Sequence, residues 1–592
     1  MEPRTSTDRP PYARFDDLRP HRRRSFELSD ADHLLIAGSA GEVADVLDAA
    51  EAAVERGSWV AGFVSYEAAP GLDPTLQVVS SPAGEFDGFP AAWFAVFPHR
   101  SPTSAAPAAG YTLGDWIASV DESGHGHAVD EIRELIKRGE TYQVNYTIGM
   151  SAPFSGSARS LYLDLTASQA CGYGAFIDAG RWQIASASPE LFFEWADGRI
   201  MCRPMKGTAP RGLVTADDEE HRLALLASEK DRAENVMIVD MVRNDLGRVA
   251  AVGSVDTPAL FTAEKYDTLW QLTSTVTATT EPGTSLLTVF RALFPSASIT
   301  GAPKVATMGI IRALEHRPRG VYCGTIGFGG PGVDGRPEWA FNVAIRTVLV
   351  DVEHGVAHYG TGGGITIDST AGGEYREALL KAEILARRTA DFRLLETMVW
   401  RPGSGVWLLD RHLNRLMESA WYFDVPIDAS IVEASIKAAT DRLTAASIVR
   451  LLVDRTGGMV VEAGPLPLAD VVVRLVLDDR PVDRLDPLLY HKTTSRSVYE
   501  AALNRHPEAP DVVLWNEADE ITETTVGNLA VLLDGEWWTP PVTSGCLPGT
   551  YRAELLDEAR IRERVISVDE LRVANAIARL NSVRGWETAF LM

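Results

Sequence analysis

Lys206 is the first residue whose type and position could do chemistry. It precedes Gly207 in CRPMKGTAPRG (202–212), where prolines and glycines are typical of a strand end and a turn. A lysine in a turn is usually a solvated charge. It becomes a nucleophile only when its amine is neutral, which requires a partly desolvated site and a depressed pKa. The motif alone leaves both interpretations open.

Carboxylates in two other segments could act with such a lysine. Glu190 follows a proline within the strand-like SASPELFFEW, and Glu234 lies on a helix predicted over 228–250 and closed by Gly247. Apolar residues follow Glu234 at i+3, i+4 and i+7, so the carboxylate lies on an apolar stripe, where it is costly unless paired or bound to a metal. The alternative is a helix-edge glutamate that bridges to Lys230 or Arg232.

Further candidates are weaker one by one. Glu377 and Lys381 stand at i, i+4 in a helix predicted over 372–388, a spacing most often found in surface ion pairs. The glycine turns YGTGGGITID (359–368) and ITGAPK (299–304) offer backbone N–H groups that could cradle a carboxylate. Either turn could equally be an ordinary tight turn.

The elements that must position these residues form two parts. Helical and strand patterns alternate from about 128 to 386, and a fresh strand-like pattern begins near 392. Dense β patterns end the chain, among them a type I′ hairpin turn predicted at Asp534-Gly535. We therefore expect a first domain over 1–386, a linker over 387–391 and a second domain over 392–592.

Composition limits the function classes. The 592 residues are 45% hydrophobic and 23% charged, which is ordinary for a soluble globular protein of several domains. The formal net charge of −25 argues against nucleic acid or an anionic membrane surface as a general partner. The four cysteines have no metal-site or disulfide spacing, and no apolar run reaches the ~18 residues of a membrane span. Cytoplasmic localisation is the expectation.

Taken together, the motifs from about 140 to 386 resemble the chorismate-utilising enzymes, which include anthranilate, aminodeoxychorismate and isochorismate synthases. The strings that carry the resemblance are ETYQVNYT, ASASPELFFE, RPMKGTAPRG, AENVMIVDMVRNDLGRV, SITGAPKVATMGII, RGVYCGTIGF, FNVAIRT, GTGGGITIDS and EYREALLKAE. The resemblance implies a mixed α+β and α/β fold whose first domain has β-sandwich-like layers with flanking helices.

The resemblance also implies roles for the candidate residues. Aminodeoxychorismate synthases carry a lysine at the position of Lys206, and its amine would add at C2 of chorismate and expel the C4 hydroxyl before ammonia adds at C4. Glu190 matches the general acid that helps the hydroxyl leave, and Glu234 and Glu377 match the glutamates that hold Mg²⁺. Matches to substrate-binding positions are Thr300, Gly301, Tyr322, Arg346, Gly362, Gly364 and Lys381.

One position departs from the anthranilate synthases. Gln271, in YDTLWQLTSTV, stands where those enzymes have a histidine near the reacting ring. An amide is neither acid nor base, so any proton transfer assigned to that histidine falls to Glu190 or water. This substitution fits a lysine mechanism that leaves the ring unaromatised.

The segments FRLLETMVW, LLDRHLNRLMESAWYF, HKTTSRSVYEAAL, ITETTVGNLAV and LPGTYRAELL resemble the two-subdomain, fold-type IV pyridoxal-phosphate (PLP) enzymes. By this resemblance Lys492 binds PLP covalently, Glu523 pairs with the pyridinium nitrogen and Arg415 binds the phosphate. The turn Gly549-Thr550-Tyr551 would supply further phosphate donors. Taken alone, a lysine such as Lys492 is more often a solvated side chain, and Glu523 could be an exposed strand glutamate.

The pairing of the two resemblances predicts synthesis of 4-aminobenzoate. The first domain would aminate chorismate to 4-amino-4-deoxychorismate, and the second would eliminate pyruvate from it as a lyase. The alternatives make the second domain an amino-acid aminotransferase or an inactive binding module. No cysteine lies in a glutaminase-type nucleophile motif, so ammonia would come from a separate glutamine amidotransferase subunit. A homodimer through the PLP domain is a further expectation.

Overall fold

The structure is a computed structural model that describes residues 10–19, 24–79, 84, 86–103, 109–167, 171–332, 334–382, 385, 392–466 and 472–592. The chain forms two compact units. Unit 1 comprises residues 1–210 and 222–389, and unit 2 comprises 211–221 and 390–592. The expected linker at 387–391 lies outside the described residues. Among the described helices, none combines the length and the apolar character that crossing a membrane requires.

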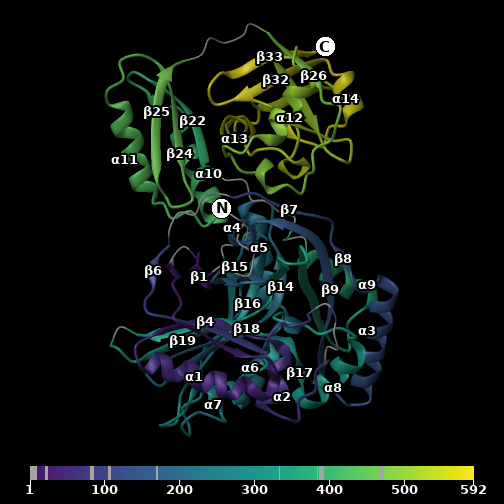
Figure 1. Ribbon diagram of the computed structural model, residues 1–592. Helices are drawn as coiled ribbons and strands as arrows, with labels where there is room; N and C mark the ends of the chain where they lie inside the picture. Colours follow the sequence, from purple (N-terminus) through teal and green to yellow (C-terminus); the bar gives the residue numbers. More distant parts are fainter. Residues whose placement is uncertain are drawn as a thin grey trace. The chain divides into compact units, whose positions relative to one another are not determined.

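Unit 1 is built on two large, mostly antiparallel sheets (Figure 1). The first has, in spatial order, β17 (Gly301–Ala302), β9 (Gln143–Gly156), β21 (Val356–Ile365), β20 (Thr347–Asp351), β11 (Trp182–Ser188), β10 (Tyr173–Ala179), β1 (Tyr12–Asp17), β2 (Arg24–Leu28) and β6 (Ser101–Pro102), with β7 (Tyr111–Leu113) and β8 (Ile117–Ala118) paired to β9. The second has β14 (Met205–Pro210), β16 (Leu269–Thr279), β13 (Arg199–Arg203), β12 (Leu191–Ala196), β19 (Pro337–Val343), β18 (Thr325–Pro331), β4 (Trp59–Val64), β5 (Ala92–Phe97) and β3 (His33–Ala37), with β15 (Asp256–Lys265) paired to β16.

Side-chain alternation in strand β5 explains how these sheets form layers. Its sequence AWFAVF is buried throughout, and successive side chains point to opposite faces. Trp93 and Phe97 join a core cluster shared by strands of both sheets, such as Phe26 of the first and Phe63 of the second. Phe94 joins a different cluster on the other face. Two sheets packed through a shared core confirm the expected β-sandwich-like layers.

Helices cover the outer faces of both sheets (Figure 1). Helices α1 (Val43–Glu55), α6 (Glu229–Leu246) and α7 (Leu286–Leu293) share a core with the second sheet. Helices α3 (Glu122–Lys137), α4 (Ala158–Ala167), α8 (Lys304–Leu314) and α9 (Ala371–Ala382) pack against the first sheet. The short helix α2 (Ala69–Leu72) follows β4. Helix α5 (Thr215–Ala227) begins in unit 2 and ends in unit 1.

Unit 2 has two subdomains, as expected for its fold. The smaller sheet has the order β23 (Gly405–Val406), β22 (Leu394–Arg401), β24 (Ser447–Val453) and β25 (Met459–Pro465), with helices α10 (Leu409–Tyr422) and α11 (Ala429–Thr440). The larger has β28 (Ile521–Thr524), β27 (Asp511–Trp515), β26 (Val473–Leu477), β33 (Gly585–Leu591), β32 (Ala576–Asn581), β29 (Asn528–Leu533), β30 (Glu536–Thr539) and β31 (Arg562–Glu563). Helices α12 (Ser497–Arg505), α13 (Thr550–Asp557) and α14 (Val568–Arg572) belong to it.

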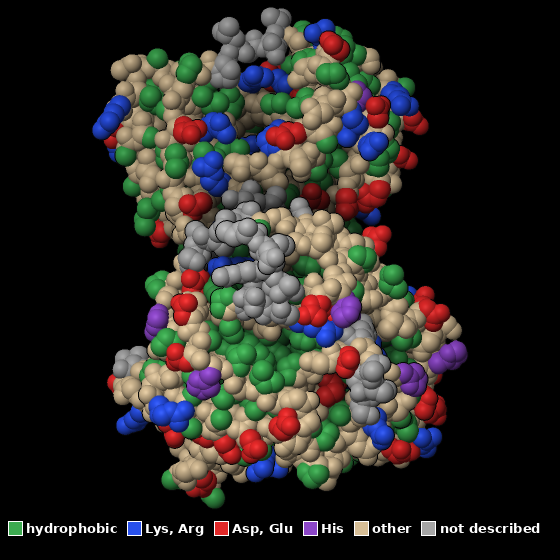
Figure 2. Space-filling model, in the orientation of Figure 1, with side chains coloured by type: hydrophobic (Ala, Val, Ile, Leu, Met, Phe, Trp, Pro, Cys, Tyr) green, Lys and Arg blue, Asp and Glu red, His purple; other side chains and the backbone are tan. Residues whose placement is uncertain are grey.

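The surface carries charges of both signs. On the face seen in Figure 2, acidic and basic side chains are interspersed over both units rather than gathered by sign. Such a surface gives little long-range attraction for a polyanion. This arrangement agrees with the net negative charge of the sequence.

Candidate active sites

Lys206 lies in strand β14 and forms an ion pair with Glu234 of helix α6. The Lys206 Nζ to Glu234 Oε2 distance is 3.2 Å, and the two side chains are 21% and 16% exposed. Asn235, the next residue of α6, donates to the Lys206 carbonyl (3.1 Å) and to the Leu272 carbonyl of β16 (3.3 Å). One buried amide thereby fixes α6 to two strands, and Glu234 is held against the lysine.

Two residues of the first sheet, Gly364 and Gln143, lie next to the Lys206 amine. A Cβ atom built at Gly364 of β21 would lie 2.8 Å from Lys206 Nζ and 2.7 Å from Gln143 Nε2. Gln143 begins β9, is 1% exposed, and its Oε1 atom has no hydrogen-bond partner among the described residues. Strands β9 and β21 pair over ten residues, with Gly364 opposite Asn145. A side chain at Gly364 would therefore displace the end of Lys206 or of Gln143.

Sequence reasoning missed Gln143, although it lies in the string ETYQVNYT. Its buried oxygen without a partner is the signal, and that signal exists only in the folded chain.

Glu377 and Lys381 of α9 also belong to this cluster. Lys381 Nζ lies 2.8 Å from Glu377 Oε1 and donates to the Gly362 carbonyl (2.9 Å). Burial raises the pKa of Glu377, but the charges of Lys381, Lys206 and Lys230 outweigh it and leave the pKa below its ordinary value. The two side chains are 39% and 54% exposed, as in a surface ion pair, but Glu377 lies near enough to Lys206 to feel its charge.

Glu374, one turn before Glu377, supplies a further carboxylate. Its Oε2 lies 3.2 Å, and Glu377 Oε1 3.9 Å, from a Cβ built at Gly363. Burial raises the pKa of Glu374, and the negative charge of Glu377 adds to the rise. Mg²⁺ is usually bound by one or two carboxylates together with water and substrate oxygens. The donor types at this point suit Mg²⁺, although no three described His, Cys, Asp or Glu side chains converge as a protein-only metal site.

Glu190 is the general acid candidate. It lies between β11 and β12, is 2% exposed, and burial raises its pKa to about 8 against the opposing hydrogen bond from Ser298. A carboxyl with this pKa is protonated near neutral pH and can donate its proton.

The loop that carries Ser298 continues into the predicted turn at Thr300 and Gly301. The Thr300 hydroxyl donates to the Ser296 carbonyl (3.1 Å), so this buried side chain is used within the loop. Gly301 has φ of +136° and pairs with Val144 of β9. The loop therefore joins the Glu190 region to the strand of Gln143.

Arg346 and Tyr322 are the predicted contacts to substrate carboxylates. Arg346 adopts φ of +50°, its guanidinium lies 5.8 Å from the Tyr266 ring centre, and burial lowers its pKa. The Tyr322 ring packs so closely on Gly360 of β21 that an added Cβ would lie 2.1 Å from it. Burial raises the pKa of Tyr322, so its hydroxyl stays protonated and can donate.

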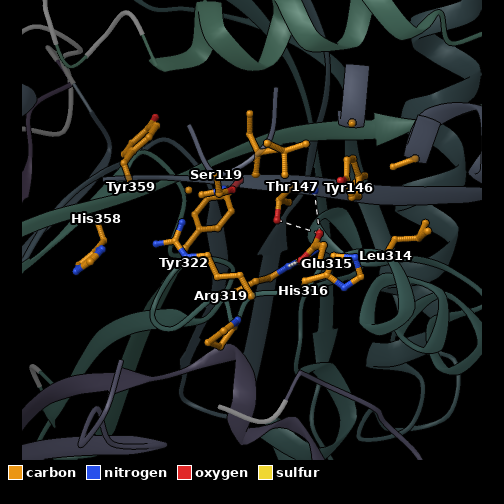
Figure 3. A pocket seen from close by; sticks show the side chains of 18 of the residues that line it. Ser119, Tyr146, Thr147, Leu314, Glu315, His316, Arg319, Tyr322, His358 and Tyr359 are labelled. Carbon is orange, nitrogen blue, oxygen red and sulfur yellow. Dashed lines mark hydrogen bonds and ion pairs between the residues drawn. The ribbon is translucent and has the colours of Figure 1, made fainter. Parts of the chain in front are cut away.

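A cavity of about 680 Å³ opens next to Tyr322 (Figure 3). At one wall Glu315 accepts hydrogen bonds from the Thr147 amide (2.8 Å) and from Arg319 (2.7 Å). The volume of this cavity is within the usual range for small-molecule sites. The predicted substrate contact Tyr322 lines this cavity, whereas the predicted catalytic residues Lys206 and Glu190 do not. Strand β21 connects the two regions, since Gly360 lines the cavity and Gly364 faces Lys206.

Gln271 holds the strand of Lys206. Its Nε2 donates to the Gly207 carbonyl (2.7 Å), and its Oε1 accepts from the Thr208 hydroxyl (3.3 Å). Gly207 has φ of +101°, which favours glycine. The Gln271 amide therefore fixes the backbone directly after the lysine.

In unit 2, Lys492 lies beside strand β22. Its carbonyl accepts from the Leu395 amide (2.9 Å), and Thr493 bridges to Leu394. Burial lowers the pKa of Lys492 to about 8, with a further decrease from Arg415. The amine thus loses its proton far more easily than an exposed lysine, as a nucleophile or proton carrier must.

Glu523 of β28 lies in the same site and is held by two donors. The Tyr499 hydroxyl donates to Oε1 (2.8 Å) and the Asn528 amide to Oε2 (3.2 Å). Burial raises the pKa of Glu523 to about 7, against the opposing hydrogen bond from Tyr499. A carboxyl in this environment is stabilised by a cationic partner, which a pyridinium nitrogen would provide.

Arg415 of α10 is oriented by a buried carboxylate that sequence reasoning missed. Its Nε and Nη2 donate to Glu396 (2.9 and 2.7 Å), and its Nη1 donates to the Pro548 carbonyl (3.2 Å). His412 also contacts Glu396 (2.6 Å). Glu396 comes from β22, two residues after the Leu394 that bridges to Thr493. One strand therefore positions both the arginine and the lysine.

Helix α13 begins at Thr550, directly after Gly549 and Pro548. Its first backbone N–H groups have no partner within the helix, which is the arrangement that binds phosphate at helix N-termini. Thr550 Oγ1 lies 3.4 Å from His412 Nε2, and the Tyr551 ring packs on Trp407 with centres 5.1 Å apart. An anion site at Arg415 and α13, a lysine and a buried carboxyl together suit the phosphate, aldehyde and ring nitrogen of PLP.

Comparisons with known proteins match the two parts of the chain to two families. Residues 22–387 match the family model of the chorismate binding enzyme, and residues 393–587 match that of the amino-transferase class IV. An aminodeoxychorismate synthase of Streptomyces griseus is 39% identical over 289 residues, 49% of this chain and 39% of that protein. Component 1 of that enzyme from Bacillus subtilis is 37% identical over 276 residues, 47% and 57% of the two chains.

Among solved structures, anthranilate synthase component I of Streptococcus pneumoniae shares the fold at 23% identity. The superposition has a TM-score of 0.51 and covers 65% of this chain and 94% of the synthase chain. The chain spans about half the length, or less, of the curated relatives it matches. With its family model matched over residues 22–387, the chain belongs to the chorismate binding enzymes, and it carries a class IV amino-transferase domain in its second part.

Proposed function

We propose that the chain converts chorismate to 4-aminobenzoate in two reactions. Unit 1 would aminate chorismate to 4-amino-4-deoxychorismate, and unit 2 would release pyruvate from that intermediate. The observation that carries the proposal is Lys206, enclosed by Glu234, Glu377 and Gly364 at the position where the motif places a nucleophile. The names of the curated relatives support the first reaction.

In the first reaction the Lys206 amine would attack C2 of chorismate while the C4 hydroxyl leaves. Glu190, whose pKa is about 8, would donate the proton that turns the departing hydroxyl into water. Ammonia would then add at C4 and expel the lysine amine. Two successive displacements explain how the amino group replaces the hydroxyl on the same ring face.

Substrate carboxylates need positive groups in a chain of net charge −25. Arg346, Lys381 and the backbone of β21 would supply them. Glu234 and Glu377 would hold Mg²⁺, which supplies charge neutralisation at the ring carboxylate. Glu377 lies with Glu374 near Gly363, and Glu234 lies at Lys206, so carboxylate donors of the kind that Mg²⁺ prefers are present.

In the second reaction PLP, when bound, supplies an electron sink for the carbon that loses a proton. Lys492 would take the proton from C4 of the intermediate. Arg415 and the N-terminus of α13 would hold the phosphate, and Glu523 would face the ring nitrogen. The enolpyruvyl group, protonated at its methylene carbon, leaves as pyruvate and the ring becomes aromatic.

The second candidate for unit 2 is amino-acid transamination, since class IV amino-transferases share these residues. The pairing with unit 1 favours the lyase because the product of one unit is then the substrate of the other. Ammonia would come from solution or from a separate glutamine amidotransferase subunit.

The test is incubation of the purified chain with chorismate, Mg²⁺, an ammonium salt and PLP, with products identified by mass. Equal amounts of 4-aminobenzoate and pyruvate support the proposal. Accumulation of 4-amino-4-deoxychorismate together with transfer of amino groups between amino and keto acids would make unit 2 an aminotransferase. Formation of anthranilate would overturn the assignment of unit 1.

A further inference from the structure

Residues 211–221 are part of unit 2, although they lie in sequence between two pieces of unit 1. Leu213 and Val214 pack against a core cluster of unit 2 that includes Leu489 and Tyr490, the residues just before His491 and Lys492. We call residues 211–221 the inserted segment. An eleven-residue segment with its own place in a hydrophobic core is a structural part of that core.

The inserted segment is fastened internally by a buried ion pair. Arg211 Nε and Nη2 donate to Asp218 (2.8 and 2.7 Å), and the side chains are 6% and 0% exposed. Asp218 also accepts from the Gly212 amide (2.9 Å). A Cβ at Gly212 would lie 2.2 Å from the Asp218 nitrogen, so the loop closes only with glycine there. The segment therefore has one defined conformation.

The inserted segment is bonded to the C-terminal end of α10, the helix that carries Arg415. The Arg211 guanidinium stacks on the Tyr422 ring at 4.2 Å and donates to the Tyr422 carbonyl (2.9 Å). The Tyr422 hydroxyl donates in return to the Gly212 carbonyl (2.8 Å). Thr215 Oγ1 donates to the Glu418 carbonyl (3.1 Å). The Tyr422 carbonyl belongs to the last four of the helix, which have no partner within the helix, so Arg211 satisfies a carbonyl that α10 itself leaves unpaired.

Tyr422 also packs against His491, the residue before Lys492. Its ring lies 4.3 Å from the His491 ring, and Ser419 of the same helix contacts His491 Nδ1 at 3.0 Å. His491 is 5% exposed, and burial lowers its pKa to about 3, so the ring is neutral. On the other side β22 binds the Lys492 carbonyl. Lys492 is thus placed by β22 from one side and by the stack of Arg211, Tyr422 and His491 from the other.

We infer that the inserted segment is a positioning element of the PLP site, which sets the place of Lys492 through Tyr422 and His491. The inference rests on the proposed function of unit 2. The segment touches neither substrate nor PLP in this proposal, so its loss would be felt as misplacement of the lysine amine. A misplacement of about 1 Å is enough to cost roughly 10²-fold in rate.

The test uses the full chain and a double variant, Arg211→Leu with Asp218→Leu. Removing both charges leaves no unpaired charge in the core, which would itself be strongly destabilising. Tyr422→Phe is the milder variant, since it keeps the ring and deletes the bond to Gly212. Glu220→Gln, at an exposed position of the same segment, is the matched control.

Three quantities are measured for each protein: the dissociation constant of PLP, the absorbance spectrum of bound PLP, and kcat and KM for pyruvate release from supplied 4-amino-4-deoxychorismate. We expect the double variant to weaken PLP binding about tenfold, the scale of a lost buried hydrogen-bond network, to alter the spectrum at saturating PLP, and to lower kcat more than it raises KM. Tyr422→Phe should change the same quantities in the same direction by a smaller factor, and Glu220→Gln should match wild type.

The outcomes separate two failures. If wild type binds PLP at Lys492 and Tyr422→Phe, folded by circular dichroism, has wild-type affinity, spectrum and kcat, the positioning role is overturned even if the double variant fails to fold. If wild type does not attach PLP at Lys492, shown by borohydride reduction and peptide mass, the proposed function of unit 2 fails first.

Discussion

At the scale of single residues, Lys206 faces two opposite demands. Its amine lies 3.2 Å from the Glu234 carboxylate in an ion pair, whereas attack on chorismate requires the amine to leave that contact. Glu234 is also a predicted Mg²⁺ ligand, and a carboxylate engaged with a divalent cation holds an ammonium less strongly. Binding of Mg²⁺ at Glu234 would therefore weaken this ion pair and make the Lys206 amine available for attack.

Lys206→Ala should lose most aminodeoxychorismate formation while the protein stays folded. A methyl group cannot attack the ring, so we expect the rate to fall by roughly 10²-fold, about 2.7 kcal/mol of transition-state stabilisation. Direct addition of ammonia would account for a residual rate. The control is Lys137→Ala, whose lysine is half exposed in a surface ion pair of α3. A Lys206→Ala rate equal to that of the control would remove the nucleophile from the mechanism.

Glu190 should set the alkaline limit of the first reaction. Its pKa is raised to about 8 by burial, so the proton needed by the leaving hydroxyl is present below that pH and lost above it. Aminodeoxychorismate formation at a fixed concentration of free NH₃ should decline as the pH rises through 8. Glu190→Gln should lower the rate roughly 10²-fold or more and abolish that decline. An unchanged pH profile in the variant would assign the limit to another group.

Residues whose chemistry follows from their type and motif could be predicted from the sequence. Residues whose importance depends on burial and on distant partners could not. Lys206, Lys492 and Arg415 stand in motifs; Lys206 and Arg415 each pair with a carboxylate, and the charges of Glu396 and Glu523 act on Lys492. Gln143, Glu374 and Glu396 carry no such signal, because their importance comes from burial and from partners distant in sequence. In the sequence Glu396 is one acidic residue of a strand, and its role is visible only in the structure, where Arg415 of α10 donates to it.

At the scale of elements, β21 shows why a glycine run is required. Gly360 accommodates the Tyr322 ring, Gly362 supplies the carbonyl for Lys381, and Gly364 leaves room for the lysine amine. Every second position thus serves a different contact along one strand. The glycine run predicted a backbone cradle, and its pairing with β9 could not be read from the sequence because strand partners 200 residues apart are set by the whole sheet.

Gly364→Ala should impair the first reaction and spare the second. The added Cβ would lie 2.8 Å from Lys206 Nζ, so the amine must move, and we expect a loss of roughly 10²-fold in aminodeoxychorismate formation. The same protein should release pyruvate from supplied 4-amino-4-deoxychorismate at the wild-type rate, which serves as the internal control. Equal activity in the first reaction would show that the lysine acts from another position.

Element boundaries were predicted well where periodicity or turn chemistry was strong. The helix expected over 228–250 is α6, Glu229–Leu246, and Gly247 follows it with a right-handed backbone rather than the left-handed one of a glycine C-cap. Asp534 and Gly535 both have positive φ and join β29 to β30, which confirms the hairpin turn. The helix expected over 372–388 is described as Ala371–Ala382.

At the scale of the whole molecule, the two sites should be separable by mutation. Lys492→Ala should stop the pathway after the first reaction, giving 4-amino-4-deoxychorismate without 4-aminobenzoate or pyruvate. Adding an authentic aminodeoxychorismate lyase should then restore 4-aminobenzoate, since distant sites act additively. Lys437→Ala, at an exposed position of α11, is the control. Formation of 4-aminobenzoate by the unaided variant would take the lyase role away from Lys492.

Glutamine should support turnover only when a separate glutaminase subunit is present. The four cysteines are buried, and burial raises the pKa of each thiol, whereas a nucleophilic cysteine needs a depressed pKa. Ammonium salts at raised pH should replace the subunit, because NH₃ is the attacking species. Efficient use of glutamine by the purified chain would contradict this expectation.

The inserted segment has a consequence for synthesis on the ribosome. About 170 residues separate its end from the rest of unit 2, so it leaves the ribosome well before the core that will receive it exists. The buried core that receives it extends to Leu514, about 290 residues later, so at ordinary elongation rates the delay is roughly fifteen to sixty seconds. During that time Leu213 and Val214 have no core partner, and unit 2 cannot be completed by its own C-terminal sequence. A ribosome pause, or a break in the gene placed between the two family matches, would therefore affect the domain that lies after it.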